Sequence, residues 1–180
     1  MKTIVICIGT GACEIAQRSL SQQVNGQFSL VFLDEEEHAD IEKKQAAGRL
    51  EEIAKSLSSN KDATIILFAT LGGITGGKYV ASMTSILKEC GVKSYAVVTM
   101  PFSWEGEKRS NWALEAFDNF KEAGCDIFAF MNDRITERIG DILKGFAWAD
   151  EKLSALIEAI ATSTTDDFLQ EENKELFLHK

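Results

Sequence analysis

The chain has 180 residues, a size at which one domain buries a substantial core without disulfides or metal ions. Hydrophobic residues make up 45% of it and charged residues 26%, and it holds a single proline and no low-complexity tract, which excludes a fibrous or largely disordered protein. The formal net charge of -9, with no local basic cluster, disfavours nucleic acid as a partner because the phosphate backbone would be repelled.

Four cysteines are spread along the chain without a CxxC pair: Cys7, Cys13, Cys90 and Cys125. Cys7 and Cys125 fall in apolar, strand-like runs, so we interpret them as core thiols. His38 and His179 are isolated from other ligand types, and no metal site is expected. The sequence shows neither a signal peptide nor a long apolar span, which predicts a cytoplasmic protein that does not cross a membrane.

Short apolar runs rich in β-branched residues predict five buried strands, at Thr3–Ile8, Phe28–Leu33, Thr64–Ala69, Ser94–Thr99 and Asp126–Met131. Helical periodicity is found at Gly11–Gln22, Ile41–Leu57, Gly77–Glu89, Glu107–Ala123, Thr136–Leu143 and Asp150–Ala161. This alternation predicts a three-layer α/β/α domain with a mostly parallel, Rossmann-like sheet, and ligands beyond the carboxyl ends of its strands. We expect residues 1–162 to form that domain and 163–180 to form a charged tail, helical from Asp166 to Leu178.

The first glycine motif, ICIGTGAC, follows the first predicted strand. Gly9 and Gly11 stand there at the mouth of a helix, where backbone amides can approach phosphate oxygens. A dinucleotide fold would need a third glycine at position 14, which is Glu14, and no GK[ST] sequence completes a Walker A loop. A dinucleotide-dependent enzyme is therefore disfavoured, and no plausible catalytic histidine supports one.

A second glycine cluster, LGGITGGK, separates the third strand from the next helix. So many glycines at a helix start lose much conformational entropy on folding, which a phosphate cradle explains better than a structural turn. The alternative is a tight turn with close helix packing. Lys78 could contact phosphate or be a solvated helix lysine.

The motifs together resemble the nucleotide-binding half of the FtsZ/tubulin superfamily. The second cluster is similar to its GGGTGxG signature, with Ile74 and Lys78 in place of glycines. MPFSWEGEKR, residues 100–109, is similar to the FtsZ segment PFxFEGxxR, and Asn132-Asp133-Arg134 resembles its NDR or NDK. The resemblance covers residues 3–161, and the ordered spacing of three motifs makes it more specific than any one of them.

The resemblance implies a guanine-nucleotide site. Its phosphate contacts would come from Gly9, Thr10, Gly11, Gly72, Gly73, Ile74, Thr75 and Gly76. Glu105 and Arg109 would lie near the ribose and guanine, although their spacing also suits an exposed helical ion pair. Phe102 and Trp104 are interpreted as packing residues rather than base-stacking ones.

The resemblance assigns the guanine ring to three further residues. Asn132 would contact it, Phe146 would stack on it, and Asp150 would accept hydrogen bonds from its N1 and N2 atoms. The chemistry is consistent, because only guanine presents two adjacent donors that match one carboxylate. GTP or GDP is therefore expected in preference to ATP.

The chain departs from the family where the family hydrolyses GTP. Glu14 aligns with an FtsZ asparagine that contacts base and sugar; a carboxylate can accept from either but repels phosphate. The acidic run at residues 34–37, Asp34, Glu35, Glu36 and Glu37, could hold Mg²⁺ or be a solvated helix start. Asp167 is a candidate acid acting on a neighbouring subunit, with a helix cap at Thr164 or Thr165 as the alternative.

These features predict an FtsZ/tubulin-like guanine-nucleotide-binding protein, cytoskeletal or membrane-remodelling, with weak or partner-dependent GTP hydrolysis. The alternative is a degenerate, non-hydrolytic module that docks on a fuller FtsZ-like partner. The second domain of FtsZ has no counterpart in these 180 residues, so ordinary filaments are not expected. The expected partners are guanine nucleotide and either further copies of the chain or an FtsZ-like protein.

Overall fold

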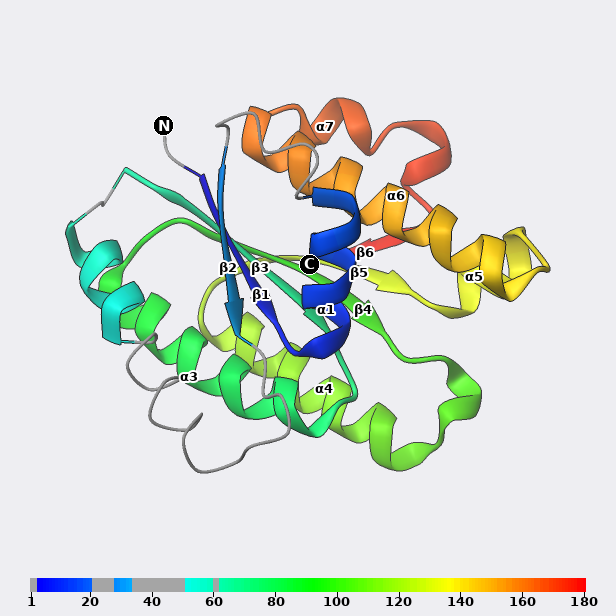
Figure 1. Ribbon diagram of the computed structural model, residues 1–180, viewed down its shortest axis with the longest axis horizontal. Helices are drawn as coiled ribbons and strands as arrows, with labels where there is room; N and C mark the ends of the chain where they lie inside the picture. Colours follow the sequence, from blue (N-terminus) through cyan, green and yellow to red (C-terminus); the bar gives the residue numbers. More distant parts are fainter. Residues whose placement is uncertain (1–2, 21–27, 34–50, 60–61) are drawn as a thin grey trace.

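The computed structural model describes residues 3–20, 28–33, 51–59 and 62–180, and it contains one six-stranded sheet with the order β2-β1-β3-β4-β5-β6 (Figure 1). The strands are β1 (Thr3–Ile8), β2 (Phe28–Leu33), β3 (Thr64–Thr70), β4 (Ser94–Met100), β5 (Asp126–Met131) and β6 (Phe177–His179). The first five are mutually parallel, and β6 runs antiparallel to β5. The predicted mostly parallel α/β fold is confirmed.

Helical segments connect these strands. They are α1 (Thr10–Ile15) with its π-helical continuation η1 (Ala16–Leu20), α3 (Ile74–Cys90), η2 (Ser103–Glu105), α4 (Glu107–Glu122), α5 (Asp133–Arg138), α6 (Ile142–Thr162), α7 (Thr165–Phe168) and η3 (Glu171–Asn173). Residues 51–59 are also helical. Among the described helices, none combines the length and the hydropathy that crossing a membrane requires.

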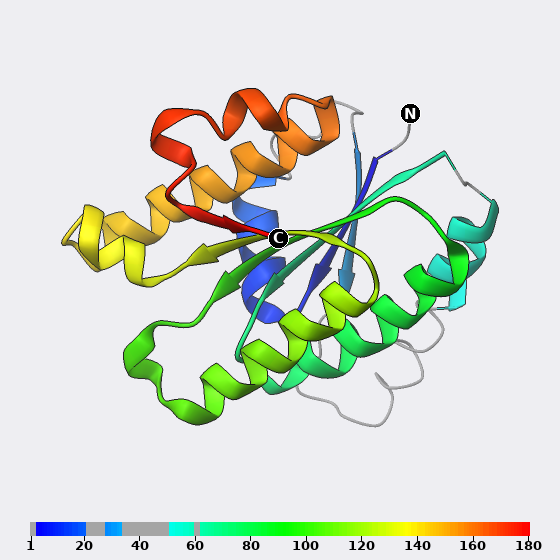
Figure 2. The same cartoon turned by 180° about the vertical axis from the view of Figure 1, so that it is seen from behind.

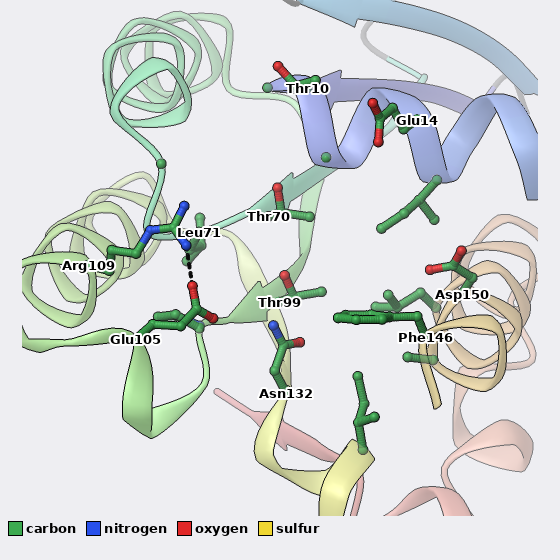
Figure 3. A pocket seen from close by; sticks show the side chains of 18 of the residues that line it. Thr10, Glu14, Thr70, Leu71, Thr99, Glu105, Arg109, Asn132, Phe146 and Asp150 are labelled. Atoms are coloured by element: carbon green, nitrogen blue, oxygen red, sulfur yellow. Dashed lines mark hydrogen bonds and ion pairs between the residues drawn. The ribbon is translucent and has the colours of Figure 1, made fainter. Parts of the chain in front are cut away.

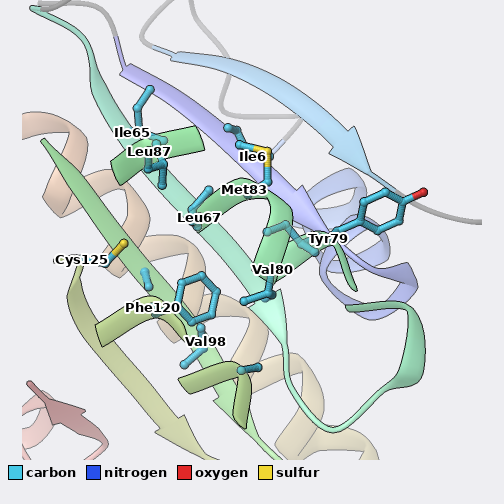
Figure 4. Packing of buried hydrophobic residues seen from close by; sticks show 14 of the residues in the cluster. Ile6, Ile65, Leu67, Tyr79, Val80, Met83, Leu87, Val98, Phe120 and Cys125 are labelled. Atoms are coloured by element: carbon cyan, nitrogen blue, oxygen red, sulfur yellow. The ribbon is translucent and has the colours of Figure 1, made fainter. Parts of the chain in front are cut away.

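One face of the sheet packs against α3, α4 and the helix at residues 51–59, as the two ribbon views show (Figures 1 and 2). Strand residues such as Ile6, Leu67 and Val98 meet Met83 of α3 and Phe120 of α4 in this layer (Figure 4). Each is fully buried. The strands read as continuous apolar runs because the opposite face is covered as well.

The other face packs against α1, η1 and α6. Alternate strand residues such as Val5 and Phe68 point to this side, where they meet Leu20 of η1 and Leu156 of α6. Cys7 also belongs to this core and Cys125 to the first, and both thiols are buried, as expected. The two cores make three layers, with the sheet in the middle.

Several helix boundaries in the structure differ from the predicted ones. The helix expected at Thr136–Leu143 is wrong as one unit, because Gly140 has a φ of 73° and Asp141 then caps a new helix by accepting from the Lys144 N–H at 3.1 Å. α6 accordingly begins at Ile142, before the expected Asp150. α3 begins at Ile74, so the last glycines of the second cluster lie inside a helix. The expected helix at Ile41–Leu57 lies partly outside the described residues.

The C-terminal segment is not a continuous helix. It forms the single turn α7, the 3₁₀ turn η3 and then β6, which pairs with β5 through Phe128 and His179 and through Phe130 and Phe177. The prediction of helix as far as Leu178 is therefore wrong. Phe177 is buried in the second core, and this packing together with the free edge of β5 outweighs the local helical pattern.

The strand order also positions a ligand site. The chain leaves β1 for β2 on one side and later continues from β3 outward on the other, so the order reverses between β1 and β3. Open parallel sheets bind ligands beyond the carboxyl ends of the strands at such a switch point. Gly9 follows β1 there and Leu71 follows β3, and both line a cavity at this edge.

Candidate functional site

The cavity at the carboxyl edge of the sheet has a volume of about 470 Å³. α1 forms one wall with Thr10 and Glu14, and Figure 3 shows Phe146 and Asp150 of α6 facing Glu105 across the opening. Thr70 of β3, Thr99 of β4 and Asn132 after β5 lie between these walls. Such a volume and such a mixture of apolar and polar linings are usual for small-ligand sites.

The first glycine motif brings α1 against the sheet. Gly9 has a φ of 83°, which L side chains rarely adopt, and its N–H donates to the Leu33 carbonyl at 2.8 Å. A Cβ at Gly11 would lie 2.5 Å from the Thr70 Oγ1 atom. Backbone from this turn therefore reaches the cavity wall with no side chain in the way.

The second glycine motif lies beside the first. Gly73 precedes the first turn of α3 and lines the cavity, whereas Gly72 is buried with a φ of 95° and packs near Pro101 and the Arg109 carbonyl. The turn thus needs glycine at position 72 for its positive φ, and Gly72 does not line the cavity. The side chains of residues 74–78, which include the expected contacts Ile74, Thr75 and Gly76, lie outside the described part of the site.

The segment from Phe102 to Arg109 borders the cavity and is held by contacts within itself. The Phe102 N–H donates to Glu105 Oε1 at 2.8 Å, and Glu105 forms an ion pair with Arg109. Phe102 is 3% exposed, in agreement with a packing role, while Trp104 stacks on it at 4.9 Å and is 67% exposed. The expected ion pair of Glu105 and Arg109 therefore forms, but it joins η2 to α4 across Gly106 instead of lying exposed on one helix, and both residues line the cavity.

Phe146 and Asp150 lie one turn apart on the same face of α6. Phe146 is 43% exposed, meets Phe102 edge-on at 6.1 Å between ring centroids and lines the cavity, so part of its ring is open to it. α6 reaches this place by close packing on α5, since a Cβ at Gly145 would lie 2.2 Å from the Ile135 Cγ2 atom. The aromatic and the carboxylate are thus presented to the cavity by a rigid element.

Asp150 forms an ion pair with Arg18. Arg18 Nη2 donates to Asp150 Oδ2 at 2.9 Å, and the side chains are 60% and 15% exposed respectively. Burial raises the pKa of the Asp150 carboxyl above its ordinary value, and the hydrogen bond and charge of Arg18 oppose that increase. The carboxylate is therefore held in a partly dehydrated position beside one guanidinium.

The cavity brings together ten of the predicted site residues: Gly9, Thr10, Gly11, Glu14, Gly73, Glu105, Arg109, Asn132, Phe146 and Asp150. Sequence reasoning missed nine others that line it, namely Ile15, Arg18, Thr70, Leu71, Thr99, Pro101, Ile135, Ala149 and Leu153. Thr70, Leu71 and Thr99 could have been predicted, because they stand at the carboxyl ends of strands, where the ligand was expected.

Asp167, the predicted acid for a neighbouring subunit, does not line this cavity. It lies in α7 and lines a separate hollow with Glu158 and Thr162 at the end of α6. Thr164 precedes α7 without a side-chain capping hydrogen bond. The acidic run at residues 34–37 lies outside the described residues, and the part of the chain that is described holds no cluster of three metal-ligating side chains.

The fold and this cavity place the chain among the α/β/α domains whose site is built at a switch point of a parallel sheet. No protein-family model matches the chain. It is 29% identical over 130 residues to the cell division protein FtsZ of Helicobacter pylori strain J99, an alignment covering 70% of this chain and 33% of that protein. With the FtsZ of Aquifex aeolicus the identity is 31% over 117 residues, covering 63% and 32%.

Solved structures show the same fold. An empty FtsZ dimer from M. jannaschii superposes with a TM-score of 0.70 at 21% identity, covering 91% of this chain and 55% of that one. CetZ from Methanosaeta thermophila superposes with a TM-score of 0.62 at 14% identity, covering 88% and 54%. The chain is thus similar to FtsZ in sequence and has the fold of FtsZ and CetZ, and its alignment with the curated relatives spans about a third of their length.

Proposed function

We propose that the chain binds guanine nucleotide in the cavity at the carboxyl edge of the sheet. The observation that carries this proposal is the arrangement of this cavity, with glycine-rich helix starts on one side and an exposed aromatic ring beside a partly buried carboxylate on the other. The nucleotide-binding unit would comprise residues 1–162. The similarity to FtsZ supports a cytoplasmic, cytoskeletal or membrane-remodelling role.

The glycine side suits phosphate. α3 is a long helix whose first turn follows Gly73, and its unpaired N-terminal amides favour an anion. Gly9 and Gly11 keep the facing turn free of side chains, so a phosphate can approach the backbone closely. Mg²⁺ bound together with the nucleotide would offset the negative charge that Glu14 brings to this part of the cavity.

The α6 side suits a purine base. The open part of the Phe146 ring offers a stacking surface, and Asp150 can accept from donors on the base edge. Guanine has two adjacent donors, N1–H and the N2 amino group. In adenine, N1 is an acceptor and C2 carries no amino group. We therefore expect GTP and GDP to bind in preference to ATP, with Asn132 adding a polar contact.

The alternative function, a non-hydrolytic module that docks on an FtsZ-like partner, is favoured by one observation. Glu14 points from α1 into the cavity, near the glycine turns where phosphate would lie (Figure 3). A carboxylate at that place weakens triphosphate binding by charge repulsion. Hydrolysis, if it occurs, would be slow and would need an acid from another subunit, for which Asp167 is the proposed source.

The test is a titration of the purified protein with fluorescently labelled GTP, followed by competition with unlabelled GTP, GDP and ATP. Asp150→Ala should weaken GTP binding about tenfold or more, the usual effect of losing a charged hydrogen bond. Asp118→Ala, an exposed aspartate on α4, is the matched control and should leave the affinity unchanged. Equal binding of ATP and GTP would contradict the proposal.

Two further measurements separate the proposed role from its alternative. Phosphate release at high protein concentration measures GTP hydrolysis, and light scattering with and without GTP measures assembly. GTP-dependent scattering supports an assembly role. Capture of an FtsZ-like protein without any response to GTP supports the docking module instead.

A further inference from the structure

The ion pair between Arg18 and Asp150 closes one side of the candidate base site. The two residues come from η1 and α6 and are 132 positions apart in the sequence, and both line the cavity. Arg18 Nη2 lies 2.9 Å from Asp150 Oδ2. One of the two carboxylate oxygens is therefore already accepting a charged hydrogen bond.

We propose that Arg18 reduces the selectivity for guanine by donating to one oxygen of Asp150, which the ligand's base then has to share with the guanidinium. This inference rests on the proposed guanine-nucleotide binding and adds to it a residue that no motif pointed to. The Arg18 side chain is 60% exposed, whereas the Asp150 side chain is 15% exposed.

The consequence follows from the donors that two purines present. Guanine offers N1–H and N2–H, which together match a carboxylate with two free oxygens. Hypoxanthine, the base of ITP, offers N1–H alone at this edge. Because Oδ2 already accepts from Arg18, the N2 amino group has to share that oxygen with the guanidinium, so guanine gains less over hypoxanthine than it would at a carboxylate with two free oxygens.

The same geometry explains why the site retains a carboxylate. Burial disfavours the charged form of Asp150, and the adjacent guanidinium favours it. Arg18 thus favours the ionised form of Asp150 but takes up part of the capacity of its carboxylate to accept hydrogen bonds. The site would recognise a purine with a donor at N1 and would discriminate weakly at the position of N2.

The experiment compares the dissociation constants of GTP and ITP for the full chain and its variants. In the unmodified protein we expect the two nucleotides to bind within a few-fold of each other. Arg18→Met keeps side-chain length and removes the donor, and it should raise the preference for GTP about tenfold, because N2 no longer shares Oδ2 with a cation. Arg18→Gln, whose amide donates without charge, should give an intermediate ratio.

The matched control is Arg138→Met. Arg138 pairs with Glu175 at 2.6 Å and does not line the cavity, so this variant removes an arginine–carboxylate pair of the same kind without touching the site. Its ratio of GTP to ITP affinity should equal that of the unmodified protein. Circular dichroism of each variant verifies that the fold is intact.

The possible outcomes separate this inference from the proposed function. If Arg18→Met strengthens the binding of GTP and of ITP by the same factor, Arg18 does not affect base selectivity. The inference is then overturned, while guanine-nucleotide binding stands. An unchanged ratio overturns it in the same way. If the unmodified protein binds neither nucleotide, the proposed function fails and the inference fails with it.

Discussion

Gly11 and Thr70 are so close that a Cβ on residue 11 would lie 2.5 Å from the Thr70 Oγ1 atom and 3.2 Å from its Cγ2 atom. Real side chains do not tolerate the shorter contact, so α1 rests on the end of β3 only because residue 11 is glycine. Both residues line the cavity. The packing of α1 on the sheet and the shape of the site therefore depend on the same contact.

We predict that Gly11→Ala destabilises the protein by about 1–3 kcal/mol, because the added methyl forces α1 away from Thr70. The free energy of unfolding from urea titration measures this effect. Thr70→Ala removes the Oγ1 and Cγ2 atoms, so in that background the loss of stability caused by Gly11→Ala should largely disappear. A penalty that persists there would show that Thr70 is not the obstacle.

Gly73→Ala is the matched control at the second glycine turn. Gly73 has a φ of -91°, and no described atom lies within 4 Å of a Cβ built on it. Alanine fits this conformation and restricts the unfolded chain, so we expect stability to be unchanged or to rise by up to about 1 kcal/mol. Marked destabilisation by Gly73→Ala would contradict the assigned backbone conformation.

Phe120 fills the core between α4 and the sheet (Figure 4). Its side chain is fully buried, so Phe120→Ala should lower the free energy of unfolding by about 3–5 kcal/mol through lost burial and the remaining cavity. Leu114 lies on the same helix and is 53% exposed. Leu114→Ala should change stability by less than about 0.5 kcal/mol, and similar losses for both variants would refute this account of α4.

Asp150 should reduce stability at neutral pH, because burial raises the pKa of its carboxyl in the folded state and Arg18 offsets this only in part. Because the folded pKa lies above the ordinary value of 3.8, protonation of Asp150 favours the folded state. This contribution to stability is fully present below pH 3.8 and is lost as the pH rises through the folded pKa. Asp150→Asn should therefore stabilise the protein at pH 7.

Urea unfolding of Asp150→Asn at pH 7 and near pH 3.5 measures this difference. The gain should shrink at the lower pH, where the natural carboxyl also becomes neutral. Asp118→Asn, an exposed substitution on α4, should show no such pH-dependent gain. A loss of stability at pH 7 would mean that the ion pair with Arg18 outweighs the effect of burial.

The four thiols should differ in reactivity. Cys7, Cys13 and Cys125 are buried, and burial raises the pKa of the Cys7 and Cys125 thiols, so the nucleophilic thiolate is scarce and shielded. Cys90 is half-buried. Native protein should therefore react quickly with iodoacetamide at Cys90 alone, as mass spectrometry can show, and Cys90→Ser should abolish this fast phase. Rapid labelling of Cys7 would contradict its position in the core.

Local sequence predicted the sheet closely because a buried parallel strand needs an uninterrupted apolar run. The bounds of β1, β2 and β5 are those expected, and β3 and β4 are one residue longer. Helix ends were less predictable, since they depend on single capping groups. Asp141 and Gly140 divide a region of continuous helical periodicity into α5 and α6, and their role becomes visible only in the backbone angles.

Within the site, the sequence by itself determined the glycine turns and the spacing of Phe146 and Asp150, because both are local properties of a strand end or a helix face. Tertiary structure decided what lies opposite them. Arg18 reaches Asp150 across 132 residues only because η1 and α6 cover the same face of the sheet, and β6 forms only because β5 offers a free edge. Such long-range contacts depend on how complete elements pack, and no local pattern encodes them.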